Sequence, residues 1–141
     1  MSTSNAVATG IKDKLNASPA LLALLPTTTT QFPSSICRNQ AADNQPLPFV
    51  VFNFQAGGPE NIYPHDLRSL LYQVRAFATS AIQAGSIDTQ ISLALHQKTL
   101  TVSGYTNTWT VREADIELVD YPPNVQPVYS AGGLYRIYLD T

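Results

Sequence analysis

Three alternating carboxylates form the pattern in this 141-residue sequence that comes closest to a catalytic site. Glu113, Asp115 and Glu117 occupy every second position of a predicted strand, which puts their side chains on one face about 6–7 Å apart. Carboxylates at that distance can act as a general acid and a general base. Ile116 and Leu118 occupy the opposite face, so a solvated edge strand, whose charge blocks stray strand pairing, is the simpler interpretation. The row could equally line a passage for DNA, because its charge repels phosphates.

Cys37, the only cysteine, is a second candidate for chemistry. Arg38 beside it could lower the pKa of the thiol, and a histidine folded nearby could then make it a nucleophile. Nothing in the sequence requires such a base, and a half-buried cysteine in a strand is the more ordinary interpretation. A single cysteine also excludes an internal disulfide and favours a reducing compartment.

The two histidines, His65 and His96, do not form a recognisable metal site. His65 falls in a loop rich in proline and glycine, His96 falls at the end of a predicted helix, and neither has a second ligand at a metal-binding spacing. His65 and Asp66 are adjacent, but a dipeptide cannot supply the three or four convergent ligands of zinc. Nucleophile-elbow, phosphate-binding and dinucleotide-binding motifs are missing as well. The sequence therefore predicts no catalytic, cofactor-binding or metal-binding residues.

The composition argues against a nucleic-acid-binding or membrane protein. Charged residues make up 13% of the chain, against a usual share of about 25%, and the formal net charge is -2. Lysines and arginines are scattered singly, which disfavours tight, sequence-independent DNA binding. The N-terminus lacks a basic region, and the longest apolar run, residues 20–25, is far shorter than the roughly 20 residues that span a bilayer. A surface of uncharged polar residues is instead well suited to assembly.

The whole chain, residues 1–141, is expected to form a single domain in three parts. Residues 1–26 form an N-terminal helical lobe, residues 27–48 an irregular connection, and residues 49–141 a core of strands with a main helix. This order of elements predicts an α+β fold with a mixed, mostly antiparallel sheet, on which the main helix and the N-terminal lobe pack.

Hydrophobic periodicity and capping residues predict the limits of the elements. Residues 49–54 are apolar on both alternating faces, which indicates a central strand covered by helices on both sides. Residues 70–78 have one apolar and one mixed face, so the second face of the sheet is expected to be partly exposed or to reach a partner. Two glycine pairs, at 57–58 and 132–133, are interpreted as turn residues. The expected helices are one ending at 16 and capped by Ser4 or Asn5, 19–25 capped by Ser18, and 80–97 capped by Ser80; the expected strands are 35–38, 49–54, 70–78, 100–102, 108–119 and 134–139.

Two long predicted loops, residues 55–66 and 121–133, are candidates for protein contacts. Both carry large apolar residues that would be costly to leave in water, and both are stiffened by prolines, so that little ordering entropy opposes binding. The interface candidates in these loops are Ile62, Tyr63, Tyr121, Val125, Val128 and Tyr129.

The succession of segments also resembles a known family. A leucine-rich run at 21–25 ends the helical lobe, a proline-flanked stretch at 45–48 leads into an apolar strand, and a strand at 72–77 is followed at once by a helix that ends at 91–95. A strand containing the run Arg112, Glu113, Ala114 and Asp115 and a closing strand at 134–139 complete the pattern. In the order and spacing of these segments the chain resembles the tail-completion or tail-terminator family of tailed bacteriophages, a group of minor tail proteins.

The resemblance implies a structural virion protein rather than an enzyme, with no cofactor. It implies a ring, usually of six copies, that caps the tail tube and joins it to the neck or head connector. The implied partners are other copies of the chain, the tail-tube protein and a neck or connector protein, with DNA passing through the ring without tight binding and no membrane involved. The implied location is the virion tail or neck, after assembly in the host cytoplasm.

Three alternatives stay open from the sequence. The chain could be another neck or head-closure adaptor of the same particle, which would share size and composition. It could be a small enzyme that uses Cys37 or the row that contains Glu113 and Asp115. It could also be a module that binds a polar ligand or nucleic acid.

Overall fold

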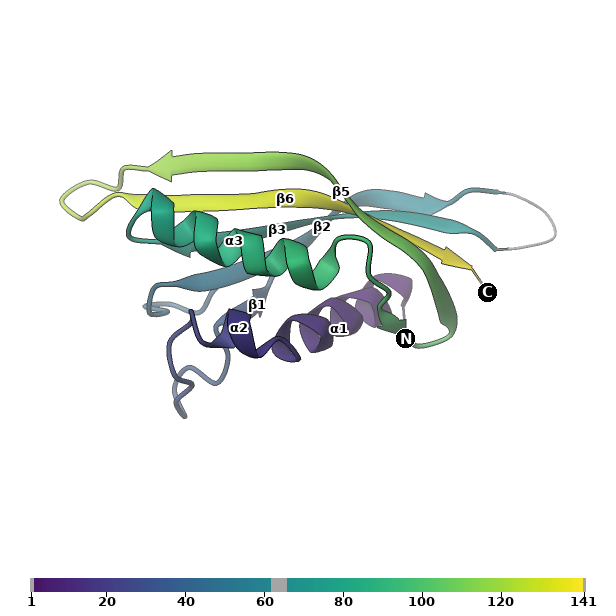
Figure 1. Cartoon of the computed structure of the whole chain (residues 1–141), viewed down its shortest axis with the longest axis horizontal. Coiled ribbons are helices and arrows are strands. Elements are labelled where there is room, and N and C mark those ends of the chain that lie inside the picture. The colour runs from purple at the N-terminus through teal and green to yellow at the C-terminus, as the bar shows by residue number, and fades with distance from the viewer. Residues whose placement is uncertain (1, 62–65, 141) are drawn as a thin grey trace.

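The computed structural model describes residues 2–61 and 66–140, in which three helices lie along one face of a long six-stranded sheet (Figure 1). The strand order is β1-β2-β3-β6-β5-β4, with β1 parallel to β2 and the other pairings antiparallel. The predicted α+β fold with a mixed, mostly antiparallel sheet is therefore confirmed. The helices are α1 (Thr3–Asn16), α2 (Pro19–Leu22) and α3 (Ala81–Leu95), and the strands are β1 (Ile36–Arg38), β2 (Phe49–Pro59), β3 (Arg68–Ala78), β4 (Thr101–Val102), β5 (Tyr105–Asp120) and β6 (Val128–Asp140).

Serine side chains begin all three helices. Ser18 and Ser80 cap α2 and α3 as predicted, but α2 ends at Leu22 rather than at residue 25. The predicted cap of α1 is wrong, because Ser2 accepts the hydrogen bond from the Asn5 N–H at 3.2 Å. Ser4 is used in the interior instead, where its Oγ lies 3.0 Å from the hydroxyl of Tyr72. Within the described ranges, no helix combines the length and the apolar character needed to cross a bilayer.

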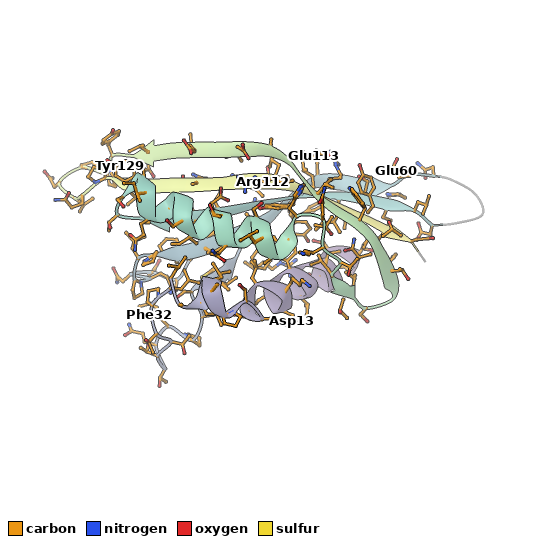
Figure 2. The ribbon with its side chains drawn as sticks, in the orientation of Figure 1. Asp13, Phe32, Glu60, Arg112, Glu113 and Tyr129 are labelled. Atoms are coloured by element: carbon orange, nitrogen blue, oxygen red, sulfur yellow. The ribbon has the colours of Figure 1, made fainter. Side chains whose placement is uncertain are left out.

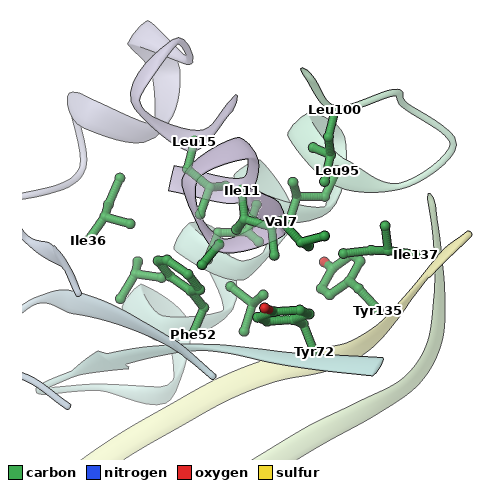
Figure 3. Packing of buried hydrophobic residues seen from close by; sticks show 14 of the residues in the cluster. Val7, Ile11, Leu15, Ile36, Phe52, Tyr72, Leu95, Leu100, Tyr135 and Ile137 are labelled. Atoms are coloured by element: carbon green, nitrogen blue, oxygen red, sulfur yellow. The ribbon is translucent and has the colours of Figure 1, made fainter. Parts of the chain in front are cut away.

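The main core lies between the helices and one face of the sheet, called here the helix-covered face. Figure 3 shows α1 lying over the sheet, with Val7, Ile11 and Leu15 pointing toward the aromatic rings of the strands. These three residues are spaced four apart, so they form one stripe along the helix. Other buried contributors include Ile87, Ile91 and Leu95 of α3, Val50 and Phe52 of β2, Tyr72 and Val74 of β3, and Tyr135, Ile137 and Leu139 of β6.

The opposite face of the sheet, called here the open face, carries no helix in the described part of the chain. The prediction that residues 49–54 are covered on both sides is therefore wrong: Val50 and Phe52 are buried, whereas Phe49 and Val51 are only partly buried. Their apolar character is explained by packing within the open face, where the ring of Phe49 stacks on Phe77 at 5.2 Å. By strand register, the large residues of the open face are Phe49, Val51, Leu71, Arg75, Phe77, Trp109, Val111, Ile116, Leu118, Leu134, Arg136 and Tyr138.

Two hairpins reach the opposite ends of the sheet (Figure 1). The predicted loops at 55–66 and 121–133 are too long, because residues 55–59 continue β2 and residues 128–133 continue β6. Both glycine pairs therefore lie in strands rather than in turns. Gly57 follows a bulge after Phe54 and has a φ of +130°, and a Cβ at this position would collide with the backbone carbonyl of Ser69.

The neighbouring glycines of β2 provide a matched test of this geometry. We expect Gly57→Ala to lower the free energy of unfolding by about 1–3 kcal/mol, because alanine must adopt a strained φ and displace the paired strand. A Cβ at Gly58 would meet no atom within 4 Å, so Gly58→Ala should change stability by no more than about 0.5 kcal/mol. Urea unfolding followed by circular dichroism measures both values, and equal losses would contradict the strained conformation.

Candidate interaction surface

The predicted acidic row of β5 is divided between the two faces of the sheet. A bulge between Arg112 and Ala114 shifts the register, so that Glu113 binds Arg136, with its Oε1 3.0 Å from the Arg136 Nε. Asp115 and Glu117 lie opposite Gly133 and Ala131, on the same side of the sheet as the buried Tyr135. The expectation that the three carboxylates project from one face is therefore wrong, because one extra residue in a strand reverses the alternation.

Arg112 lies under α3 on the helix-covered face and makes the densest polar contacts in the described structure (Figure 2). Its Nη1 and Nη2 donate to the two carboxylate oxygens of Asp88, both at 2.8 Å, and its Nε donates to Asp115 at 2.7 Å. Further bonds reach the hydroxyl of Tyr135 at 3.1 Å and the carbonyl of Gly132 at 2.8 Å. All five N–H groups of the guanidinium are therefore satisfied.

This network joins α3 to β5 and β6 of the sheet. The side chains of Arg112 and Asp88 are only 13% and 16% exposed, so their ion pair is largely screened from water. The hydrogen bond to Asp88 raises the pKa of Arg112 above its usual range, and burial raises the pKa of Tyr135. Both shifts favour the forms that Arg112 and Tyr135 have near neutral pH, so these two groups position α3 with a fixed charge.

Gly133 makes the Arg112 network possible. A Cβ at Gly133 would lie 2.6 Å from the Nε of Arg112, in the space that the guanidinium now fills. The glycine pair therefore provides room for side chains that cross β6. The sequence analysis assigned the two glycines to a turn, because paired glycines are common in turns. The alternation of apolar and polar residues directly after them was the signal that they belong to a strand.

The remaining candidates for chemistry are not brought together. The Nδ1 of His96 accepts a hydrogen bond from the backbone N–H of Arg112 at 3.0 Å, at the edge of a groove of about 520 Å³ between α3 and β5. Asp66 pairs with Arg68 at 3.3 Å, and His65 lies outside the described residues. In the described ranges, no three His, Cys, Asp or Glu side chains converge as metal ligands.

Cys37 is a half-buried residue of β1, as the simpler interpretation of the sequence predicted. Its Sγ lies 3.8 Å from the carbonyl oxygen of Ser34. Burial raises the pKa of the thiol, and the opposing effect of Lys12 is smaller. A raised pKa is the reverse of what a nucleophilic cysteine requires.

The interface candidates occupy three different settings. Tyr121 and Val125 lie in the connection between β5 and β6, where they are 74% and 63% exposed. Val128 and Tyr129 were predicted in a loop but belong to β6, and Tyr129 packs against a small cluster that contains Ala84. Tyr129 lies in a strand because it pairs with Ala78 of β3 and Val119 of β5. Ile62 and Tyr63 lie outside the described residues.

The open face also carries exposed apolar side chains. Trp109 is 50% exposed, Leu118 54% and Tyr138 38%, although all three lie in paired strands. The prediction that the second face of residues 70–78 is partly exposed is confirmed, since Leu71 and Phe77 are only partly buried. Exposed apolar side chains on the surface of a single copy are candidates for contacts with another protein, so the open face and the hairpin tip are candidate interaction surfaces.

Comparisons with known proteins agree with a role in assembly. The model of the family described as Tail completion protein gp17 matches residues 9–120. The fold is similar to that of a chain in the solved structure "Virion of native gene transfer agent (GTA) particle", with a TM-score of 0.70 at 10% sequence identity. The alignment covers 99% of this chain and 98% of that chain, and at this identity it shows a shared fold. No curated protein sequence matches the chain.

The two arginine–carboxylate pairs of β5 should differ in their contribution to stability. We expect Arg112→Leu to lower the free energy of unfolding by about 3–5 kcal/mol, because it leaves the carboxylate of Asp88 buried without its partner. Arg136→Leu is the matched control: its pair with Glu113 is 26% and 38% exposed, and its loss should cost about 1 kcal/mol or less. Chemical unfolding at pH 7 measures both. Similar losses at the two positions would show that the Arg112 network does not hold α3.

Thiol reactivity provides a test at Cys37. Because burial raises the pKa of the thiol, the folded protein should react with a disulfide reagent at pH 8 several-fold more slowly than the urea-unfolded chain. Raising the pH should increase the rate in the folded state. Cys37→Ala should retain stability to within about 1 kcal/mol. A folded thiol that reacts faster than the unfolded one would restore Cys37 as a candidate nucleophile.

Proposed function

Since this chain belongs to the Tail completion protein gp17 family, we propose that it is a tail terminator, which caps the tail tube of a phage virion and joins it to the neck. Family membership makes it a tail-associated structural protein, and this is the observation that carries the proposal. The terminator role is the specific form that fits a chain of this size with large exposed apolar surfaces.

We propose that the terminator acts as a ring of six copies. A closed ring built from identical copies needs two different, complementary patches on each copy, because head-to-tail contacts close only when the rotation does. The open face and the tip of the β5–β6 hairpin are two such patches, and they lie on different parts of the molecule. The proposed contact residues of the two hairpins remain Ile62, Tyr63, Tyr121, Val125, Val128 and Tyr129.

The ring would meet a tail-tube protein on one side and a neck or connector protein on the other. DNA would pass through it without tight binding, because the net charge is -2 and basic residues are scattered. Of the acidic row Glu113, Asp115 and Glu117, only the residues on one side of β5 could face the lumen, because Glu113 lies on the open face and the other two lie on the opposite side. No bond is made or broken in this role, which needs neither a catalytic residue nor a cofactor. Assembly would take place in the host cytoplasm and end with the protein in the virion tail or neck.

Electron microscopy of the purified protein, alone and mixed with tail tubes, tests this proposal. We expect rings, and rings seated on the ends of tubes whose growth then stops. Tyr121→Ser and Val125→Ser should each weaken association by about 1–3 kcal/mol while leaving unfolding unchanged, because both side chains are exposed in the single copy. Leu93→Ser is the matched control, since Leu93 is 63% exposed on α3 and should have no effect on association.

The same electron microscopy experiment distinguishes the terminator from other functions. Rings that bind connectors but never tube ends would indicate a neck or head-closure adaptor instead. A protein that stays monomeric and does not bind tubes would contradict the proposal altogether.

A further inference from the structure

A second arginine crosses β6 on the open face, and its surroundings differ from those of Arg112. Arg75 of β3 lies opposite Gly132, where a Cβ would meet the Arg75 Cγ at 2.8 Å, so Gly132 leaves the room in which this side chain lies along the sheet. The Arg75 Nη2 donates to the Oγ of Ser130 at 2.6 Å, and the guanidinium lies 4.9 Å from the centre of the Phe77 ring.

Unlike Arg112, Arg75 is left incomplete. Its Nε is buried and has no hydrogen-bond partner among the described residues, and no carboxylate of the described chain lies within ion-pair distance of it. Burial lowers the pKa of Arg75, and the charge of Asp120 offsets only part of that effect. The buried Nε is out of reach of another chain, so a carboxylate of a second chain would bind the outer edge of the guanidinium, through Nη1 and Nη2. A guanidinium beside apolar side chains and without an ion pair is a site that such a carboxylate would complete, because it can bind through two parallel N–H bonds.

The chain itself carries the complementary group. Residues 113–135 contain four acidic residues and no lysine, arginine or histidine. Glu113 binds Arg136 and Asp115 binds Arg112, whereas Glu117 makes no ion pair within the described ranges. Glu117 is exposed on the same side of β5 as Val119, which is 42% exposed, so a contact there would bury apolar surface beside the charge.

We propose that Arg75 on the open face binds the carboxylate of Glu117 from the β5–β6 hairpin of a second copy of the chain. The inference rests on the proposed ring and names one of its contacts. The contact joins two different patches, so each copy can donate its hairpin to one neighbour and receive the hairpin of the other. Asp120 of the same copy lies close enough to influence Arg75 but does not pair with it, so it attracts the cation without occupying its donors.

Charge exchange tests the contact. Arg75→Glu and Glu117→Arg should each weaken self-association, measured by sedimentation, by about tenfold or more, because each places two like charges together. The double variant Arg75→Glu with Glu117→Arg restores an opposite pair and should recover most of the wild-type affinity. Lys98→Glu is the control, since it makes the same change in charge as Arg75→Glu at an exposed position away from both patches. Arg75→Gln should also weaken association and serves if Arg75→Glu does not fold.

The outcomes separate this contact from the ring itself. Rings that form equally well in every variant would overturn the contact and leave the proposed function standing. Single variants that fail to assemble, with no recovery in the double variant, would overturn Glu117 as the partner. A wild-type chain that does not self-associate but loses tube binding on Arg75→Glu would assign the site to a carboxylate of the tube protein and overturn the second-copy contact. A wild-type chain that neither self-associates nor binds tubes would overturn the proposed function together with the contact.

Discussion

Beyond its pairing with β6, β5 is held to the helical layer mainly by polar contacts. Within the described ranges only Tyr105, at the start of β5, packs against the apolar core, and the two buried side chains of the strand are Asn107 and Thr110. Asn107 accepts a hydrogen bond from the Leu100 N–H at 2.8 Å and donates to the carbonyl of Tyr138 at 2.9 Å. Arg112 provides the strongest of these contacts, because its charge is matched and all its donors are used. Directional bonds of this kind fix one orientation, whereas apolar contacts tolerate sliding.

Because polar residues of β5 make the contacts to the helical layer, apolar residues of this strand can lie on the open face. Ile116 and Leu118 follow the bulge at residue 113 and join Leu134 and Tyr138 of β6 on the open face. The helices of the same chain cannot cover this face, because their apolar sides are already occupied by Tyr72 and the rest of the core. A partner chain could cover this surface, as we propose for this member of the Tail completion protein gp17 family.

The sequence predicts those parts of the fold that depend on neighbouring residues. Ser18 and Ser80 were identified as caps because capping is a local hydrogen bond, and the alternation of β3 correctly indicated an exposed second face. The wrong predictions concern residues whose contacts are made with distant parts of the sequence. Serine often caps helices, but the hydroxyl of Ser4 instead forms a hydrogen bond with the hydroxyl of Tyr72, 68 residues away. Of the site, the exposed hairpin tip was predicted, but the division of the acidic row was not, because a bulge is set by pairing with β6 and leaves no distinct local pattern.

The centre of the sheet joins β3 to β6, whose paired residues Arg75 and Gly132 are 57 positions apart. Contacts of this sequence separation must close a long loop, which costs more chain entropy than closing a local hairpin such as β5–β6. The open face is built from both strands, and Arg75 meets Gly132 and Ser130 only after β6 has docked. The surface around Arg75 therefore exists only in the completed sheet, whereas the β5–β6 hairpin is held by residues close together in the sequence. In the proposed ring, only a copy whose sheet is complete could receive a neighbour at Arg75.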